Sequence, residues 1–398
     1  MTNTLLNELT DYPFARLRNL LNDCTPPKDL KALVMSIGEP QMQPPKILAE
    51  GLNAHKDIWN KYPNMAGTPE LRTAIGQFLD ARYGLNGLDF DAQSQIIPVN
   101  GTREGLFMLG MLCLNKQGRE RPIVLMPNPF YQVYHGASVM NGAETYFCAA
   151  DAQNNFQPDY TKLPKEILVR TQLAYICSPS NPQGALMGLE QMKAQLALAR
   201  TYGFTLVVDE CYSEIYRNQP PIGGLDAAKA LGSSLDNLLV VNSLSKRSSA
   251  AGLRSGFVAG DKNLVQFMLR LRNYGGAVLP GPIQAASAQL WADQTHVAAN
   301  RKAYNQKFAI AAEILKDWPN FKIPKGGFFL WLPVKDDEKA AKYLWQNQAL
   351  RILPGSYLSR EVNGINPGKK YIRVAIVHDD ALIHEGLTRL RYAMDAII

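Results

Sequence analysis

The chain has 398 residues, of which 46% are hydrophobic and 19% charged, so it is long enough for two domains and too apolar to be disordered. Its net charge of +7 comes from scattered positive residues rather than basic runs, which argues against nucleic acid as a partner. The N-terminus lacks the pattern of a signal peptide, and no apolar stretch reaches the length of a membrane span, so we expect no membrane association.

Short runs of apolar residues alternate with helix-length segments, such as 188–202, through the middle of the chain. Several of these runs are almost wholly apolar, as expected of strands that are covered on both faces. The alternation predicts an α/β domain with a mostly parallel sheet. The predicted strands are 95–99, 122–126, 172–177, 204–208, 238–242 and 256–259.

The C-terminal part of the chain mixes strands and helices in a different order, which predicts a smaller α+β domain. Residues 321–334 (FKIPKGGFFLWLPV) suggest a hairpin that turns at 325–327. Further strands are expected at 351–353 and 371–377, and helices at 337–346 and 381–395. We therefore expect an N-terminal segment (1–40) that joins the small domain, a large domain (41–288) and a small C-terminal domain (289–398).

The five cysteines are odd in number and widely spaced, a pattern that favours reduced thiols over a disulfide framework and places the protein in the cytoplasm. The five histidines form no group with the spacing of metal ligands, so we expect no metal site.

Polar residues follow three of the predicted strands directly. Asn181 comes after 172–177, Asp209 and Tyr212 after 204–208, and Lys246 after 238–242. Ligands of open α/β sheets bind beyond the carboxyl ends of the strands, so these side chains are expected to converge. Each residue alone has an ordinary explanation, such as a helix cap for Asp209 or a surface position for Lys246. Their combination predicts a binding site.

This combination resembles the class I and II aminotransferases, which have fold type I and depend on pyridoxal 5′-phosphate (PLP). The resemblance runs from IGEP at 37–40 through SLSKRSSAAGLRSGF at 243–257 to YIR at 371–373. It implies a large domain with a mostly parallel seven-stranded sheet, a smaller α+β domain and a homodimer. Lys246 matches the lysine that holds PLP as a Schiff base and then moves a proton on the substrate.

The resemblance assigns further roles around the ring of the cofactor. Asp209 matches the carboxylate that keeps the ring nitrogen protonated, which lets the ring withdraw electrons from the substrate. Asn181 and Tyr212 match the donors to the ring oxygen, and Tyr131 matches the aromatic residue that stacks on the ring. Tyr62 matches a tyrosine that reaches the PLP phosphate of the neighbouring subunit.

The phosphate of the cofactor needs compact donors and a fixed positive charge. Ser243, Ser245 and Arg254 match the residues that supply them. The backbone N–H groups of Gly101, Thr102 and Arg103 open a predicted helix and would add a favourable dipole. An ordinary strand-to-helix turn is the alternative explanation of that segment.

The substrate carboxylate also has matching partners. Arg373 lies in an apolar strand, where an unpaired charge is costly, and matches the arginine that binds the α-carboxylate. The N–H of Gly38 and the side chain of Asn181 match further ligands of the same group. Because Arg373 and Gly38 lie outside the large domain, we expect the small domain to close over the substrate.

Several longer stretches, including YPFARLRNLL, PNPFYQVYHGA and DECYSEIY, are similar to the proteobacterial N-succinyldiaminopimelate aminotransferases of lysine biosynthesis. Such enzymes exchange an amino group between glutamate and a succinylated keto acid. Both substrates carry a carboxylate beyond the one beside the reacting carbon, so we expect a second cation, with Arg247, Arg272 and Lys31 as equal candidates.

Other activities remain open. The chain could be an aspartate, aromatic or alanine-type aminotransferase, or a cysteine-S-conjugate β-lyase. A ligand-sensing domain of a transcription regulator is disfavoured, because only about 36 residues precede the IGEP segment and leave no room for a helix-turn-helix domain.

Overall fold

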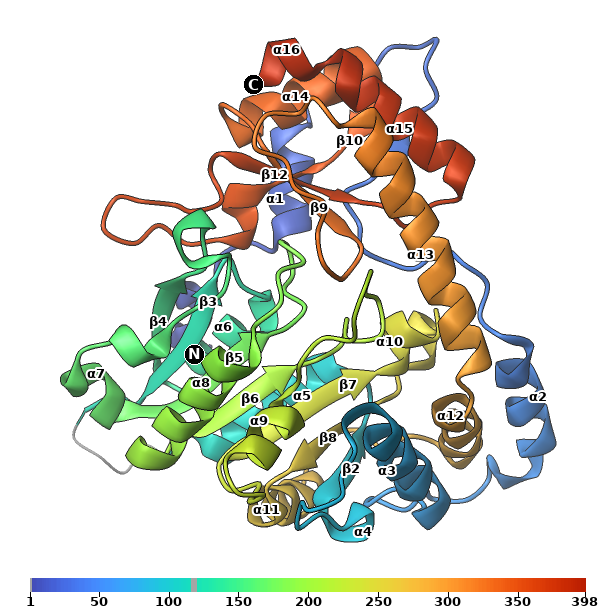
Figure 1. Cartoon of the computed structure of the whole chain (residues 1–398), viewed down its shortest axis with the longest axis vertical. Coiled ribbons are helices and arrows are strands. Elements are labelled where there is room, and N and C mark those ends of the chain that lie inside the picture. The colour runs from blue at the N-terminus through green and yellow to red at the C-terminus, as the bar shows by residue number, and fades with distance from the viewer. Residues whose placement is uncertain (1, 116–119) are drawn as a thin grey trace.

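The computed structural model describes residues 2–115 and 120–398. Among these residues, seven strands form the sheet at the centre of the larger part of the molecule (Figure 1). Strand β8 runs antiparallel to both of its neighbours, and the remaining neighbours in the sheet are parallel. The order across the sheet is β2 (Ile96–Val99), β8 (Gly256–Gly260), β7 (Leu238–Ser243), β6 (Thr205–Asp209), β5 (Thr171–Cys177), β3 (Ile123–Asn128) and β4 (Glu144–Ala149).

The predicted α/β fold with a mostly parallel sheet is confirmed, and all six predicted strands are present within one or two residues of their expected bounds. The seventh strand, β4, was not recognised in the sequence. Its side chains are mostly half-buried because it lies at the edge of the sheet, and its sequence ETYFCA therefore lacks the apolar run of the central strands.

Helices cover both faces of the sheet, which explains why the central strands are apolar throughout. Alternate residues of each strand point to opposite faces, so Val208 and Val240 pack into one core and Val207 and Val241 into the other. The first core is covered by α3 (Pro69–Tyr83), α7 (Lys165–Arg170), α8 (Leu189–Tyr202), α9 (Gly224–Ala230) and α12 (Gly281–Ala292). The second is covered by α5 (Thr102–Cys113), α6 (Gln132–Met140) and α11 (Lys262–Arg272).

The smaller part of the molecule lies above the carboxyl ends of the parallel strands (Figure 1). Its three-stranded antiparallel sheet has the order β11 (Leu353–Pro354), β12 (Tyr371–Ala375) and β9 (Phe329–Pro333). The N-terminal segment joins it, because β1 (Leu33–Val34) pairs with β10 (Leu350–Arg351). Its helices are α1 (Pro13–Leu20), α14 (Asp337–Gln348), α15 (Asp380–Tyr392) and α16 (Met394–Ile397).

One long helix, α13 (Thr295–Ile314), runs from the larger part of the molecule into the smaller one (Figure 1). It follows α12 almost directly, and α12 packs against α2 (Lys46–Ala54) and α3. The remaining short helices are α4 (Ala92–Gln95) and α10 (Leu244–Arg247). The predicted division at residue 288 falls inside α12, and it stays a prediction. None of the described helices is long and apolar enough to cross a membrane.

The predicted hairpin at 321–334 is wrong. Only its second half forms a strand, β9, which pairs with β12 instead of with residues 321–324. Pro324 has no N–H to donate to a ladder, and the turn after it docks elsewhere: the N–H groups of Lys325 and Gly326 both donate to the carbonyl of Gly184. Gly326 also bridges to Tyr216. The turn therefore closes over the larger part of the molecule.

Candidate active site

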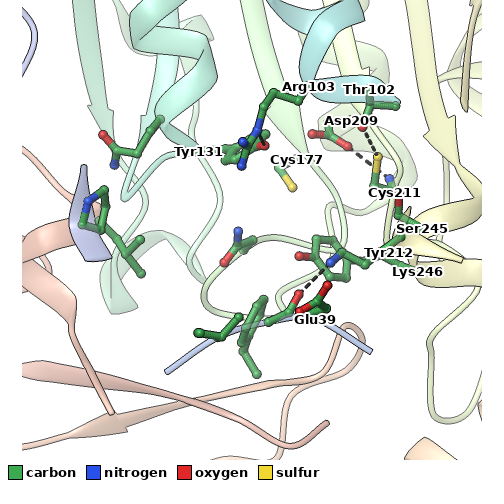
Figure 2. A pocket seen from close by; sticks show the side chains of 18 of the residues that line it. Glu39, Thr102, Arg103, Tyr131, Cys177, Asp209, Cys211, Tyr212, Ser245 and Lys246 are labelled. Atoms are coloured by element: carbon green, nitrogen blue, oxygen red, sulfur yellow. Dashed lines mark hydrogen bonds between the residues drawn. The ribbon is translucent and has the colours of Figure 1, made fainter. Parts of the chain in front are cut away.

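Most of the described residues predicted to form a site line one cavity, and Gly101 and Tyr62 are the two that do not. A cavity of about 520 Å³ lies at the carboxyl ends of the parallel strands, between the two parts of the molecule. Figure 2 shows Arg103 and Tyr131 together on one side of it and Lys246 with Tyr212 on another. The predicted residues that line the cavity are Gly38, Thr102, Arg103, Tyr131, Asn181, Asp209, Tyr212, Ser243, Ser245, Lys246, Arg254 and Arg373.

Lys246 lies in α10, the single turn of helix that follows β7. Its Nζ donates a hydrogen bond of 2.6 Å to the carbonyl oxygen of Gly38, in the N-terminal segment that covers the cavity. Burial lowers the pKa of the Lys246 amine from 10.5 to about 8, because a charged ammonium group loses its hydration there. Near neutral pH this lysine therefore has an accessible neutral form, which a nucleophile or a base requires.

Asp209 ends strand β6 and is buried beneath the cavity. Its Oδ2 accepts a hydrogen bond of 2.7 Å from the hydroxyl of Tyr134, and its Oδ1 accepts one of 3.1 Å from the N–H of Cys211. Burial raises the pKa of Asp209, while these hydrogen bonds act in the opposite direction. No described cation forms an ion pair with this carboxylate, so a protonated ring nitrogen of PLP would supply the missing charge.

The phosphate end of the site is built around Gly101, the N-cap of α5. Gly101 has a φ of 77°, and a Cβ at this position would lie 2.0 Å from Nη2 of Arg254. Glycine is therefore required for the guanidinium to approach the start of the helix. Together with Ser243 and Ser245, these groups form a set of donors and positive charge that fits the phosphate of PLP.

Arg373 projects from β12 of the small sheet and is buried. Its Nη1 donates a hydrogen bond of 3.0 Å to Oδ1 of Asn181, and its Nη2 donates one of 2.8 Å to the carbonyl of Ser36. Its guanidinium carbon lies 4.1 Å from the centre of the Phe329 ring. Burial lowers the pKa of Arg373 to about 10, and Nε has no partner among the described groups. A substrate carboxylate would satisfy both the charge and the donor.

Tyr131 is the N-cap of α6, and its hydroxyl accepts a hydrogen bond of 3.0 Å from Nε of Arg103. Nη2 of Arg103 lies 3.3 Å from the hydroxyl of Tyr12, a residue of the N-terminal segment. The hydrogen bond from Arg103 lies beside the cavity, so the side chain of this residue is part of the site in addition to its predicted backbone N–H.

Three residues of the site were not predicted from the sequence. Tyr134 is fully buried and looks like an ordinary core aromatic of α6, three residues after Tyr131. Cys211 lies between Asp209 and Tyr212, and its Sγ is 3.2 Å from Oγ1 of Thr102. Tyr12 precedes a helix near the N-terminus. Cys211 could have been found from its place between two predicted site residues. The sequence gives no comparable signal for Tyr134 or Tyr12.

Tyr62 is not among the described residues that line the cavity, and its side chain is fully exposed. None of the three candidates for the distal cation is among the described residues that line the cavity. Arg247 is buried and donates to main-chain carbonyls at the end of α12, and Arg272 is buried against Glu104 and the carbonyl of Ala277. Lys31 is exposed and does not line the described cavity, which instead includes the side chain of Arg103.

No group of three or more His, Cys, Asp or Glu side chains in the described part of the chain is arranged to hold a metal ion. All five cysteines are unpaired.

Comparisons with known proteins agree with this geometry. Residues 31–390 match the family described as aminotransferase class I and II. A crystal structure of an aminotransferase from Neisseria meningitidis superposes with a TM-score of 0.94 and 41% identity over 99% of this chain and 100% of that one. The aminotransferase AspB of Helicobacter pylori gives a TM-score of 0.89 and 35% identity over 97% and 99% of the two chains.

Among curated proteins, an LL-diaminopimelate aminotransferase of Dehalococcoides mccartyi is 27% identical over 91% of both chains. A 4-dedimethylamino-4-oxo-anhydrotetracycline transaminase of Streptomyces rimosus is 29% identical over 89% of this chain and 92% of its own.

Proposed function

Because the chain belongs to the class I and II aminotransferases of fold type I, which depend on PLP, we propose that it moves an amino group from glutamate to N-succinyl-2-amino-6-ketopimelate. The products would be 2-oxoglutarate and N-succinyl-LL-2,6-diaminopimelate, an intermediate of lysine biosynthesis. The observation that carries the proposal is that the cavity of Lys246 holds the guanidinium groups of Arg373 and Arg103 in addition to that of Arg254 at the phosphate end.

When bound, PLP withdraws electrons from the α-carbon of the substrate, and the protein must supply the rest of the chemistry. As a neutral amine, Lys246 can take the proton from the α-carbon of glutamate, and as an ammonium group it can deliver a proton to the α-carbon of the keto acid in the second half of the reaction. Asn181 and Tyr212 line the cavity on the side of Arg373, where they can orient the reacting group. Fixing these groups beforehand lowers the entropic part of the barrier.

Arg373 is the proposed partner of the α-carboxylate that both substrates share. Its two terminal nitrogens already donate to two neutral acceptors, Asn181 Oδ1 and the carbonyl of Ser36. A carboxylate can replace the weaker neutral acceptors with charge-assisted hydrogen bonds. Because Arg373 belongs to the small sheet and Asn181 to the large part, such binding would favour closure of the two parts.

Arg103 is the proposed partner of the distal carboxylate. Its side chain donates to two phenol oxygens, of Tyr131 at 3.0 Å and of Tyr12 at 3.3 Å, and both are neutral. No described carboxylate forms an ion pair with this guanidinium. The adjacent walls of the cavity are apolar and come from Pro13, Phe14, Phe130, Leu353 and Leu358. An apolar extension beside a cation suits a long acyl chain that ends in a carboxylate better than it suits aspartate alone.

The similarity of several sequence stretches to succinyldiaminopimelate enzymes supports this substrate, and so do relatives whose names refer to diaminopimelate. Five unpaired cysteines fit an enzyme of the reducing cytoplasm.

We also propose that two copies assemble and that Tyr62 of each copy enters the cavity of the other. The side chain of Tyr62 is fully exposed, and Ile58 and Trp59 in the same segment are 39% and 55% exposed. Exposed large apolar side chains in one short segment are typical of an interface. Light scattering should give a dimer, and Tyr62→Ala should weaken cofactor retention without unfolding the chain. A monomer at working concentration contradicts this assembly.

A coupled assay tests the activity directly. With glutamate as donor, a panel of keto acids with and without a succinylated amine should show the highest kcat/KM for the succinylated dicarboxylate. Preference for oxaloacetate, pyruvate or an aromatic keto acid would favour the other aminotransferases. Release of pyruvate from a cysteine conjugate without any 2-oxoglutarate would favour the β-lyase.

The identity of the cofactor lysine is tested separately. Borohydride treatment of the protein loaded with PLP should leave a covalent label on the peptide that contains Lys246. Lys246→Ala should abolish the label and lower the rate by about 10²–10⁴-fold or more, the usual contribution of a positioned acid–base group. A label on another lysine rejects the assignment.

A further inference from the structure

The residue after the cofactor lysine, Arg247, is almost completely buried, at 1% exposure. Its guanidinium donates hydrogen bonds to the carbonyls of Leu290 (2.6 Å), Trp291 (3.2 Å) and Asp293 (3.1 Å), which end helix α12. Its guanidinium carbon also lies 5.0 Å from the ring centres of Phe78 and Trp291. Burying a cation is costly unless it is compensated, and the two terminal nitrogens of Arg247 are compensated by these three carbonyls, whereas its Nε has no partner among the described groups. The side chain thereby holds the turn that carries Lys246 against the end of α12.

The next residue, Ser248, joins the start of α13. Its Oγ lies 2.8 Å from Nε2 of His296, and Nδ1 of His296 contacts Oδ2 of Asp293. Asp293 also accepts hydrogen bonds from the N–H groups of Thr295 and His296, which are the first residues of α13. The serine, histidine and aspartate thus connect the lysine turn to the point where α12 ends and α13 begins.

The order serine–histidine–aspartate is that of a hydrolase triad, but the setting differs. Ser248 has no exposed surface, and it is not among the described residues that line the cavity of Lys246. A nucleophile needs access to its substrate. The arrangement is therefore a connection between segments.

A second connection lies one turn further along α13. The side chain of Asn300 donates a hydrogen bond of 3.0 Å to the carbonyl of Arg247. The guanidinium of Arg301 binds the carbonyl of Glu214 at 3.1 Å and its carboxylate at 3.0 Å. Glu214 belongs to the loop that carries Tyr212. The first two turns of α13 therefore contact both the turn that carries Lys246 and the loop that carries Tyr212.

We propose that Arg247, Ser248 and His296 are positioning residues that couple Lys246 to the hinge between α12 and α13. Helix α13 enters the small part of the molecule (Figure 1), so a change in its direction on closure moves the atoms that hold the lysine turn. When the small part of the molecule closes over a dicarboxylate, the same movement therefore positions Nζ of Lys246, the atom that exchanges the proton. The proposal rests on Lys246 as the cofactor lysine and on closure by the substrate.

The test uses the protein loaded with PLP and three variants. Arg247→Met removes the donors to α12, and Ser248→Ala removes the link to His296 with little change in volume. Arg389→Met is the matched control, because Arg389 is also a buried arginine that donates to main-chain carbonyls, those of Lys31 and Gln348, but it contacts neither the lysine turn nor the hinge.

Two readouts separate positioning from general stability. The first is the pKa of the linkage between lysine and cofactor, read from its absorbance with and without saturating glutarate, an unreactive dicarboxylate. We expect glutarate to change this pKa in the wild type and Arg389→Met, and to change it by less than half as much in Arg247→Met and Ser248→Ala. The second is turnover: kcat should fall about tenfold to a hundredfold with little change in KM, because a displacement of ~1 Å at the reacting group has effects of that size.

A full response to glutarate and an unchanged kcat in Ser248→Ala overturn the coupling, whatever the melting temperatures are. If Arg247→Met does not fold, Ser248→Ala decides alone. If glutarate fails to bind the wild type, the dicarboxylate assignment is rejected, and the kcat of the two variants against Arg389→Met still tests the coupling. If the borohydride label is not on Lys246, both proposals fail.

Discussion

The hydroxyl of Tyr134 donates a hydrogen bond of 2.7 Å to Oδ2 of Asp209. The ring of Tyr134 is stacked on that of Tyr175 at 4.4 Å, and the hydroxyl of Tyr175 is bound to the carbonyl of Leu106. Tyr134 therefore cannot turn away from the carboxylate. A donor held in this way stabilises the charged form of Asp209 against the opposing effect of burial, which raises its pKa.

Replacing Tyr134 by Phe is expected to weaken PLP binding about tenfold to a hundredfold, because a hydrogen bond to a charged group contributes ~1.5–3 kcal/mol. Equilibrium dialysis of the cofactor measures this. Tyr160→Phe is the matched control, since it also removes a buried hydroxyl that donates a hydrogen bond, here to the carbonyl of Tyr175, but leaves the bond to Asp209 in place. Equal losses of affinity in both variants would show that packing, and not the bond to Asp209, is responsible.

The lowered pKa of Lys246 predicts how fast the protein takes up its cofactor. Only the neutral amine reacts with the aldehyde of PLP, and burial lowers the pKa of this amine from 10.5 to about 8. The rate of uptake should therefore rise with pH and level off above about pH 8 instead of continuing towards 10.5. Absorbance after rapid mixing measures the rate. A rate of uptake that keeps rising at pH values well above 8 contradicts the assignment of Lys246 as the amine that reacts with PLP.

Arg103 should matter for dicarboxylates only. Arg103→Gln removes the charge and is expected to lower kcat/KM for glutamate about tenfold to a hundredfold, since a charge-assisted bond contributes ~1.5–3 kcal/mol. Alanine, which has no distal carboxylate, should be affected far less. Arg373→Gln serves as the comparison, because it should impair both amino acids. If alanine loses as much as glutamate in Arg103→Gln, the side chain acts through Tyr131 or the cofactor instead.

Glu210, next to Asp209, offers a test of stability. Burial raises its pKa from 4.5 to about 7, while the hydroxyl of Tyr83 and the N–H of Gly224 donate to its two oxygens. The folded state thus binds this proton more tightly than the unfolded state, and its contribution is present at low pH and lost as pH rises from 4.5 towards 7.

Glu210→Gln keeps the carbonyl that accepts from Gly224, and the hydroxyl of Tyr83 can accept from the new amide. The variant should therefore gain stability relative to the wild type at pH 8, by at most about 3 kcal/mol, and should gain little near pH 4. Urea unfolding at both pH values measures the difference. A variant that is destabilised equally at both would show that Glu210 is charged in the folded protein.

The fold and most of the site could be predicted because their signals are local. Polar residues stand at or just after the ends of the apolar strands β5, β6 and β7, and SLSKRSSAAGLRSGF carries Lys246 and Arg254 at a recognisable spacing. The family, the fold class and the dependence on PLP were confirmed, whereas the role of each site residue stays a prediction.

What could not be predicted depends on contacts between distant segments. Tyr134 and Asp209 are 75 positions apart, and only the packing of α6 on the sheet brings them together. Arg247 was one of three candidates for the distal cation, but its guanidinium donates to carbonyls more than 40 positions away, at the end of α12. The turn at 325–327 was taken for a hairpin because its partner, Gly184, lies in another part of the chain.

The buried carboxylate of Asp209, with no described cation paired to it, has a consequence for the life of the protein in a cell. A chain that lacks PLP has no ring nitrogen to compensate the buried Asp209 carboxylate. It is therefore easier to unfold and to degrade than the chain that holds PLP. The steady-state amount of the enzyme, and not merely its activity, should then follow the supply of vitamin B6.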